Sequence, residues 1–153
     1  MNTRYYVGID PGQSGGIACI HSVPGSIEEV AAKKMPETER DIYEVLRDVC
    51  GSMDTFCIIE KVHSMPKQGV VSTFKFGRNY GFLRGILIAQ NVPFDEVSPG
   101  VWQRHLGCLT KGDKNITKSK AQQLFPTIKV THSIADSLLI AEYCRRIKSG
   151  ERK

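Results

Sequence analysis

The sequence predicts an α/β fold in which about five strands form a mixed central β-sheet flanked by helices. Three strand-like runs come first, two more alternate with helical patterns, and the last third of the chain is helical. A chain of 153 residues with ordinary apolar and charged content fits one domain. We therefore expect a single domain over residues 1–153, in which residues 148–153 form a basic tail.

The N-terminal runs predict a hairpin followed by a weaker third strand. Residues 4–9 are strand-like and end at Asp10, a Pro-Gly turn follows, and residues 17–21 return as the second strand. Residues 28–35 are weakly strand-like.

Two later runs predict the remaining strands, at residues 55–60 and 92–97. The first of them is apolar and β-branched, which is typical of a buried central strand.

Helical spacing of apolar residues and turn signals predict five helices. We expect them at residues 38–50, at 71–89, from Ser98 onward, at 117–124 and at 133–147. Thr117 should cap the fourth helix, after a loop over residues 107–116.

Glycines recur every four residues in the helix over residues 71–89. Gly77, Gly81 and Gly85 therefore share one helix face. Because each glycine costs a helix roughly 1 kcal/mol relative to alanine, we expect a close backbone approach to compensate. The surface approached is either the sheet or a second subunit.

Charge is distributed unevenly along the chain. Residues 1–60 hold 5 basic and 10 acidic residues, whereas residues 61–153 hold 16 basic and 6 acidic ones. The basic part also contains several aromatic side chains, and this combination favours a polyanion such as DNA or RNA as the partner. The alternative is a solvated surface that only aids solubility.

Cysteine usage and hydropathy indicate a cytoplasmic protein. The 5 cysteines include no C-x-x-C pair, so neither a disulfide framework nor a zinc site is supported. Cys19 and Cys57 lie in apolar runs and should be buried. No apolar run approaches the ~20 residues of a membrane helix. The apolar run near the N-terminus is also too short for a secretory signal.

Three carboxylates stand where chemistry is often placed. Asp10 and Glu60 end strand-like runs, and Asp136 is the single acid near the start of the last helix. Converging carboxylates repel one another, and Mg²⁺ relieves this repulsion by accepting hard oxygen ligands. We therefore expect a two-metal site, with His132, four residues before Asp136, as proton shuttle or fourth ligand.

Each of these residues also has a simpler interpretation. Asp10 could start a turn, Glu60 could pair with Lys61 on the surface, and Asp136 could be a favourable charge near a helix N-terminus. His132 could be a residue of the cap region.

Several segments resemble the RuvC-type Holliday junction resolvases. They are Gly8-Ile9-Asp10-Pro11-Gly12, Ile58-Ile59-Glu60-Lys61-Val62 and Ala135-Asp136-Ser137-Leu138, and the segment Phe74 to Gly81 is similar to phage and prophage members. The resemblance implies a ribonuclease-H-like fold and paired, metal-dependent nicking of four-way DNA junctions by a homodimer. It also implies Mg²⁺ or Mn²⁺ as the cofactor, with two ions per subunit, and no small-molecule substrate.

The resemblance assigns roles residue by residue. Asp10, Glu60 and Asp136 match the catalytic acids, but Ser133 stands where the family has a fourth acid or a histidine. His63 stands where the family often has an aromatic residue that stacks at the junction centre. Lys118 stands near the place of a lysine beside the scissile phosphate. The expected phosphate contacts are Lys61, Lys67, Lys75, Arg78, Lys111, Lys114, Lys118 and Lys120.

Three other functions compete with junction resolution. One is a ribonuclease-H-like nuclease that cuts other branched DNA or RNA–DNA hybrids, and another is a non-catalytic nucleic-acid-binding module of the same fold. The third is an ATPase of the sugar-kinase and Hsp70 type, whose phosphate loop resembles Asp10 to Gly16. Those ATPases close two domains over ATP, which 153 residues cannot supply.

Overall fold

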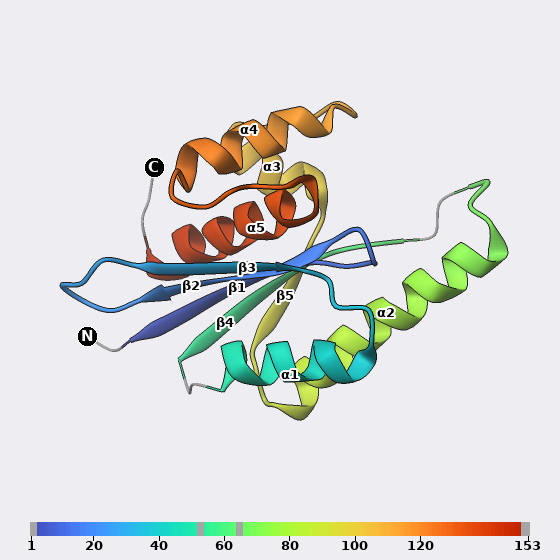
Figure 1. The fold of residues 1–153 in the computed structure, drawn as a ribbon, viewed down its shortest axis with the longest axis horizontal. Helices are drawn as coiled ribbons and strands as arrows, with labels where there is room; N and C mark the ends of the chain where they lie inside the picture. Colours follow the sequence, from blue (N-terminus) through green and yellow to red (C-terminus); the bar gives the residue numbers. More distant parts are fainter. Residues whose placement is uncertain (1–2, 52–53, 64–65, 151–153) are drawn as a thin grey trace.

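A five-stranded sheet lies between two layers of helices in a computed structural model that describes residues 3–51, 54–63 and 66–150 (Figure 1). Helices α3, α4 and α5 cover one face of the sheet, and α1 and α2 cover the other. The predicted α/β fold with a mixed sheet is confirmed. The strands are β1 Arg4–Asp10, β2 Gly16–Ser22, β3 Glu29–Lys34, β4 Thr55–Glu60 and β5 Phe94–Val97.

The strand order across the sheet is β3-β2-β1-β4-β5. The first three strands pair antiparallel, and β1 pairs parallel with β4, as β4 does with β5. The predicted hairpin is correct and extends by two pairs, Arg4 opposite Ser22 and Asp10 opposite Gly16. Strand β5 begins later than expected, since Pro93 has no N–H for the ladder and precedes it.

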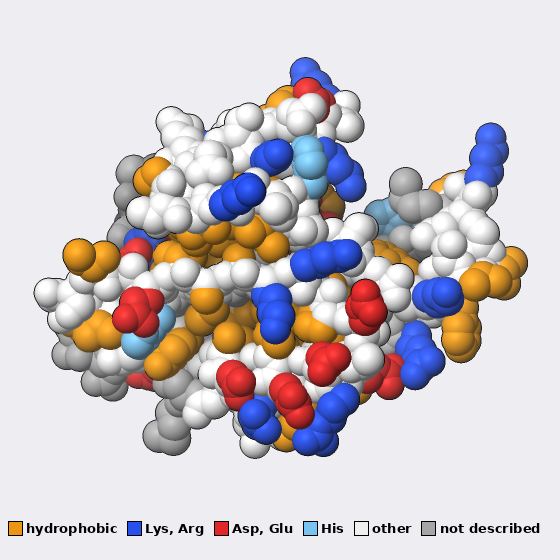
Figure 2. Space-filling view, viewed as in Figure 1, with side chains coloured by type: hydrophobic (Ala, Val, Ile, Leu, Met, Phe, Trp, Pro, Cys, Tyr) orange, Lys and Arg blue, Asp and Glu red, His pale blue; other side chains and the backbone are white. Residues whose placement is uncertain are grey.

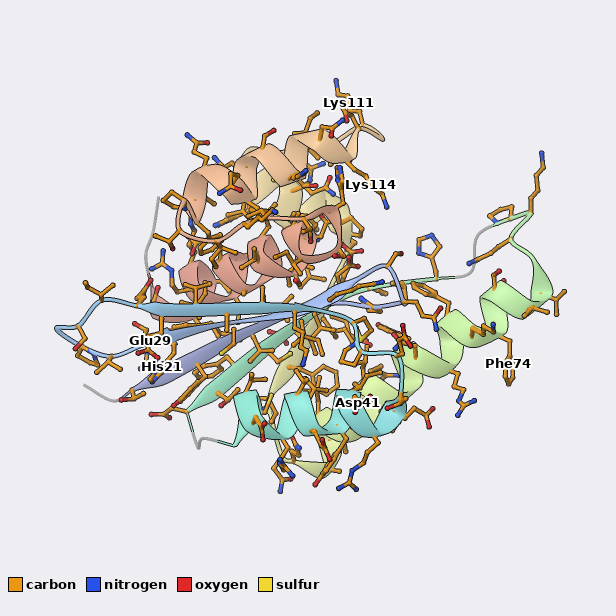
Figure 3. The ribbon with its side chains drawn as sticks, viewed as in Figure 1. His21, Glu29, Asp41, Phe74, Lys111 and Lys114 are labelled. Carbon is orange, nitrogen blue, oxygen red and sulfur yellow. The ribbon has the colours of Figure 1, made fainter. Side chains whose placement is uncertain are left out.

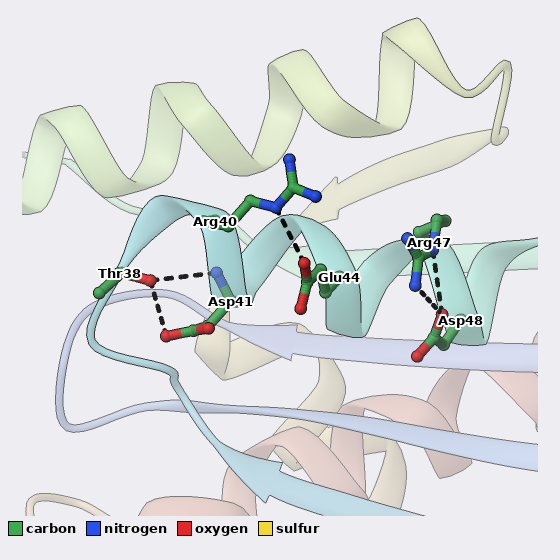
Figure 4. Close-up of polar contacts among 6 residues, drawn as sticks. All are labelled: Thr38, Arg40, Asp41, Glu44, Arg47 and Asp48. Carbon is green, nitrogen blue, oxygen red and sulfur yellow. Dashed lines mark hydrogen bonds and ion pairs between the residues drawn. The ribbon is translucent and has the colours of Figure 1, made fainter.

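All five expected helices are present, with bounds that differ mainly in the last two. They are α1 Glu39–Cys50, α2 Val70–Ala89, α3 Pro99–Leu106, α4 Lys114–Leu124 and α5 His132–Ser149. Thr38 caps α1 by accepting from the Asp41 N–H at 3.1 Å, and Arg40 pairs with Glu44 one turn along (Figure 4).

The start of α4 corrects the sequence prediction. Asp113 is the cap, and its side chain accepts from the Asn115 N–H at 2.9 Å. Residues 114–116 are therefore helical rather than part of a loop, and Thr117 is a buried residue of the second turn. A carboxylate at the N-cap competes well with a later threonine hydroxyl for the free N–H groups of the helix.

The C-terminal end also differs from the expectation. Helix α5 continues to Ser149, so Lys148 belongs to the helix and not to a tail. The Lys148 ammonium pairs with Asp95 Oδ2 at 3.1 Å. The last three tail residues, 151–153, lie outside the described residues.

Strand alternation sorts the core into two clusters. Tyr6, Ile20 and Ile58 pack beneath α5, whereas Ile9 and Ile59 pack against α1 and α2. The expected burial of Cys19 and Cys57 is confirmed. Among the described residues, no helix combines the length and the apolar content needed to cross a membrane.

Glycines allow α5 to lie directly on the central strands. A Cβ atom at Gly8 would clash with the Ser137 carbonyl and the Ala141 nitrogen of α5. A Cβ atom at Gly16 would come within 2.7 Å of the Ser133 carbonyl oxygen. This close contact brings the first turns of α5 to the end of β1.

Helix α2 projects beyond the sheet at its N-terminal end (Figure 1). Its glycine face does not pack on the sheet, because Cβ atoms at Gly77, Gly81 and Gly85 would meet no atom within 4 Å. The first of the two expected explanations for these glycines, contact with the sheet, is therefore wrong.

Candidate active site

Two acids end neighbouring parallel strands on the same face of the sheet. Ile9 of β1 lies opposite Ile59 of β4, so Asp10 and Glu60 follow side by side at one edge. Alternation turns both away from the face of Ile9 and Ile59 and toward the face covered by α5. Both side chains are only partly exposed.

The third acid comes from α5. Asp136 lies in the second turn, between the buried Ala135 and Ser137. Its charge raises the pKa of Asp10 and of Glu60, so the three carboxylates act on one another across β1, β4 and α5.

Burial is the main influence on all three carboxylates. It raises the pKa of Asp10 well above its ordinary value, and the charges of Glu60 and Asp136 raise it further. Burial also raises the pKa of Glu60, to about 7, and raises the pKa of Asp136. The surroundings of the three acids therefore disfavour their charged forms.

Two neighbouring side chains donate to or lie beside the acids. The Trp102 indole Nε1 donates to Glu60 Oε2 at 2.9 Å, which lowers the pKa of Glu60 against the effect of burial. The Thr117 hydroxyl donates to the Lys114 carbonyl at 3.2 Å and lies close enough to Asp136 to lower the pKa of that carboxyl. The sequence does not predict either residue as part of the site, because nothing in the local pattern links them to acids far along the chain.

Lys114 is the lysine whose charge influences all three acids. Its charge lowers the pKa of Asp10, Glu60 and Asp136. Figure 3 shows Lys114 at the start of α4, with Lys111 just before it. Lys118 lies one turn further along and lines a different depression, together with Asn115, Ser119, Gln122 and Gln123.

His132 opens α5, so the condition for placing it one turn from Asp136 is met. Its charge lowers the pKa of Asp136. The neighbouring Ser133 hydroxyl is 2.9 Å from the Thr131 hydroxyl.

A depression of about 560 Å³ borders Lys114 and His132, and none of the three acids is among its lining residues. Its lining comes from the turn after β1, the end of β3 and the starts of α4 and α5: Gln13, Ser14, Lys34, Lys114, Thr131, His132 and Ser133. Three of these side chains are basic, which makes the rim suited to an anion. Lys34 is not predicted from the sequence as a contact for an anion, because the first sixty residues are acidic on balance.

The basic residues named from the sequence are spread over the surface. Lys61, His63, Lys67, Lys75 and Lys111 are exposed. Arg78 pairs with Glu39 at 2.8 Å. Burial raises the pKa of the Cys108 thiol, and the charge of the nearby Lys120 opposes that rise. Figure 2 shows acidic side chains at the lower edge over α1, mixed there with Lys and Arg, whereas the upper helices and the projecting end of α2 carry mainly Lys and Arg. The surface is hollowed between the upper helices and the projecting end of α2.

The turn after Asp10 is held by α2. The Gly12 N–H donates to Asn79 Oδ1 at 2.8 Å. Gly12 has a φ of 96°, and a Cβ atom there would meet the Phe76 ring at 2.7 Å. The segment Phe74 to Gly81, which carried part of the resemblance, thus supports the loop that positions Asp10.

The carboxylates have the chemistry of a hard-cation site but are not yet gathered around one point. Within residues 3–51, 54–63 and 66–150, no three His, Cys, Asp or Glu side chains form a ready metal-binding group. Asp136 Oδ1 is nevertheless buried without a hydrogen-bond partner in this part of the chain, and mutual repulsion raises the pKa of Asp10. A divalent cation would relieve both costs, so the donor set fits, and the side chains would have to close around the ion.

Comparison with solved structures identifies the fold. A structure of Thermus thermophilus RuvC matches with a TM-score of 0.61 and 17% identity, over 95% of this chain and 96% of that one. T. thermophilus RuvC in complex with Holliday junction substrate matches with a TM-score of 0.60 and 16% identity, over 96% of each chain. The chain therefore has the ribonuclease-H-like fold of RuvC, as the sequence predicted.

Comparison by sequence finds nothing similar. No protein-family model matches the chain. No curated protein matches it either.

Proposed function

We propose that this protein is a metal-dependent endonuclease that cuts branched DNA, with the four-way junction as its substrate. The observation that carries the proposal is that Asp10 and Glu60 end adjacent strands at one edge of the sheet, within reach of the charge of Asp136 on α5. Their position in a RuvC-like fold, one of whose solved structures holds a Holliday junction, supports the choice of substrate.

Asp10, Glu60 and Asp136 are the side chains that would hold Mg²⁺ or Mn²⁺, two ions in each subunit, with His132 beside them. When bound, such ions activate a water for attack on the phosphate and stabilise the leaving 3′ oxygen. The residues contribute hard oxygen ligands whose charge the surrounding protein leaves poorly compensated.

Lys114 has the best placement for contact with the phosphate that is cut. Its charge acts on all three acids, and an ammonium at that position would also stabilise negative charge that develops on the phosphate. His132, on the rim of the depression, is placed to exchange a proton with solvent near Asp136.

The substrate would lie across the hollow between the upper helices and the projecting end of α2. The DNA backbone would be contacted by four exposed lysines, Lys61, Lys67, Lys75 and Lys111. His63, three residues after Glu60, would stack on a base at the branch point. Phosphate contacts of this kind make affinity fall steeply with salt.

Helix α2 supports a two-fold dimer. It is apolar on both sides: Leu83 and Leu87 are buried against the sheet, whereas the opposite side is exposed. That exposed side, the outer face of α2, consists of Val70, Phe74, Gly77, Gly81, Gly85 and Ile88. Figure 3 shows Phe74 pointing away from the sheet.

A second copy of the chain is the occupant we propose for the outer face of α2. The glycines would let two such helices approach closely, with Phe74 and Ile88 packing at either end. A junction has two symmetric scissile phosphates, and a two-fold axis places one site on each. Sedimentation equilibrium at micromolar concentration should detect the dimer, and a monomer alone would contradict it.

The decisive experiment compares substrates. Purified protein is incubated with labelled four-way junction, fork, RNA–DNA hybrid and duplex, with Mg²⁺, with Mn²⁺ and with chelator. We expect paired nicks in the junction that require the metal. Preferential cutting of the hybrid would support the other nuclease, and binding without cutting under every condition would support a non-catalytic module.

A further inference from the structure

Trp102 is the single tryptophan of the chain and is fully buried. Its indole N–H does not bond to a backbone carbonyl but to the Glu60 carboxylate, at 2.9 Å from Oε2. A buried indole N–H needs a hydrogen-bond acceptor. Here the acceptor is a partly exposed acid at the edge of the sheet, and it is one of the three acids of the candidate site. The bond links α3 to the end of β4.

We propose that Trp102 is a positioning residue that holds Glu60 for single-oxygen coordination of the metal ion. The inference rests on the proposed function, because it assigns a role toward the ion that Asp10, Glu60 and Asp136 would bind. The hydrogen bond uses one lone pair of Oε2 and fixes the orientation of the carboxylate, so Oε1 is the oxygen that we expect to bind the ion.

Glu60 is fixed from both directions. Its backbone ends β4, where the next N–H, that of Lys61, donates to the Val97 carbonyl at 2.8 Å. Its side chain is tied to an indole that belongs to the core beneath α5, with Leu106 one turn further along α3. Because the three acids are not yet gathered, a fixed Glu60 gives Asp10 and Asp136 a defined point toward which to close.

Removing the hydrogen bond should weaken metal binding without removing a ligand. Trp102→Phe keeps an aromatic ring in the core but has no N–H. Outer hydrogen-bond partners of metal-binding side chains typically contribute 10–100-fold to metal affinity. We therefore expect Trp102→Phe to bind Mn²⁺ about tenfold more weakly.

Leu106→Ala is the matched control, since it loosens the same helix in the same core cluster. We expect it to lower the melting temperature while it keeps Mn²⁺ affinity within about twofold of wild type, as the bond to Glu60 stays intact. Free Mn²⁺ measured by electron paramagnetic resonance gives the affinity of each protein without reference to nuclease activity.

A second measurement uses the unaltered chain. One tryptophan gives one indole cross-peak in a ¹H–¹⁵N spectrum, and this peak reports on the Glu60 carboxylate directly. We expect added Mg²⁺ to shift this peak in wild type. The shift should depend on Mg²⁺ concentration in the same way as the displacement of bound Mn²⁺ by Mg²⁺.

The outcomes separate the two proposals. If wild type binds Mn²⁺ but Trp102→Phe binds it equally well, or the indole peak does not respond to bound Mg²⁺, Trp102 has no positioning role and the nuclease proposal stands. An equal loss of affinity in Leu106→Ala also overturns the positioning role. If wild type binds no Mn²⁺ at all, the proposed function fails and the inference fails with it.

Discussion

The acid edge of the sheet and the projecting end of α2 are built in opposite ways. At the edge, each acid follows a residue that is at most 1% exposed, Ile9, Ile59 or Ala135. On α2, Val70 is 86% exposed and Phe74 is 72% exposed. The core therefore fixes the groups proposed for chemistry, whereas the apolar side chains at the projecting end of α2 have no cover within the described chain. This contrast separates a proposed reaction centre whose three acids all come from one chain from an exposed apolar surface that we propose a second copy covers.

Replacing the acids tests the edge most strongly. Asp10→Asn, Glu60→Gln and Asp136→Asn each remove a charged ligand, and we expect junction cleavage to fall by about 10³-fold or more because metal catalysis contributes several kcal/mol. Junction binding, measured by gel shift, should change little. Asp48→Asn on α1 is the control for loss of one exposed carboxylate. Loss of binding in all three site variants would count against the metal interpretation.

Two lysines of α4 test which positive charge contributes to cleavage at the acid edge of the sheet. We expect Lys114→Ala to reduce cleavage by about 100-fold, the scale of one lost electrostatic contact to a developing charge. Lys118→Ala removes the same charge four residues away, where it lines a separate depression, and should cost less than about threefold. Equal effects in single-turnover assays would remove the special role of Lys114.

Gly81 lies on the outer face of α2, and replacing it tests the proposed dimer interface. The replacement should affect the stability of the helix and the formation of the dimer in opposite directions. A side chain there meets open space in one subunit, so Gly81→Gln should stabilise the helix by roughly 1 kcal/mol. The same side chain would obstruct the glycine contact between subunits, so sedimentation should shift toward monomer. Ser72→Gln, also exposed but about half a turn from Phe74, is the control and should leave assembly unchanged. A stable dimer of Gly81→Gln would exclude the outer face of α2 as the interface.

Glu60 links the edge to stability through pH. Its pKa is about 7 in the folded protein against an ordinary value of 4.5, so between these values the folded chain keeps a proton that the unfolded chain has released. Stability should therefore fall as pH rises through this window and stay low above it. Glu60→Gln removes this loss and should be more stable than wild type at about pH 8, by up to about 3 kcal/mol, but not at about pH 4.

Urea unfolding at both values of pH measures the difference. Adding Mg²⁺ at about pH 8 should stabilise wild type more than Glu60→Gln, because the ion binds the folded carboxylates. A stability difference that does not depend on pH would contradict the burial of Glu60 as its cause.

Much of the fold was predictable because local signals and burial agree. The alternating and apolar runs ending at Asp10 and Glu60 carry strand periodicity, and the same periodicity directs both acids toward one face. Nearness in space was not encoded locally: Trp102 and Lys114 reach the acids only because α3 and α4 pack beside α5.

Two of the predictions that differ from the structure, the start of α4 and the contact of the α2 glycines, also have physical causes. Thr117 has a hydroxyl suited to a helix cap, but Asp113 stands one turn earlier and caps the helix more effectively. The glycines of α2 indicated a close approach without indicating its partner, since the pattern is identical for a sheet and for another subunit.

Diffraction from crystals soaked in Mn²⁺, with anomalous data collected at the manganese edge, tests the central claim most directly. The account predicts anomalous peaks within bonding distance of the Asp10, Glu60 and Asp136 carboxylates, drawn together around the ions. Fully occupied manganese at other places only, with these three side chains unmoved, would contradict it.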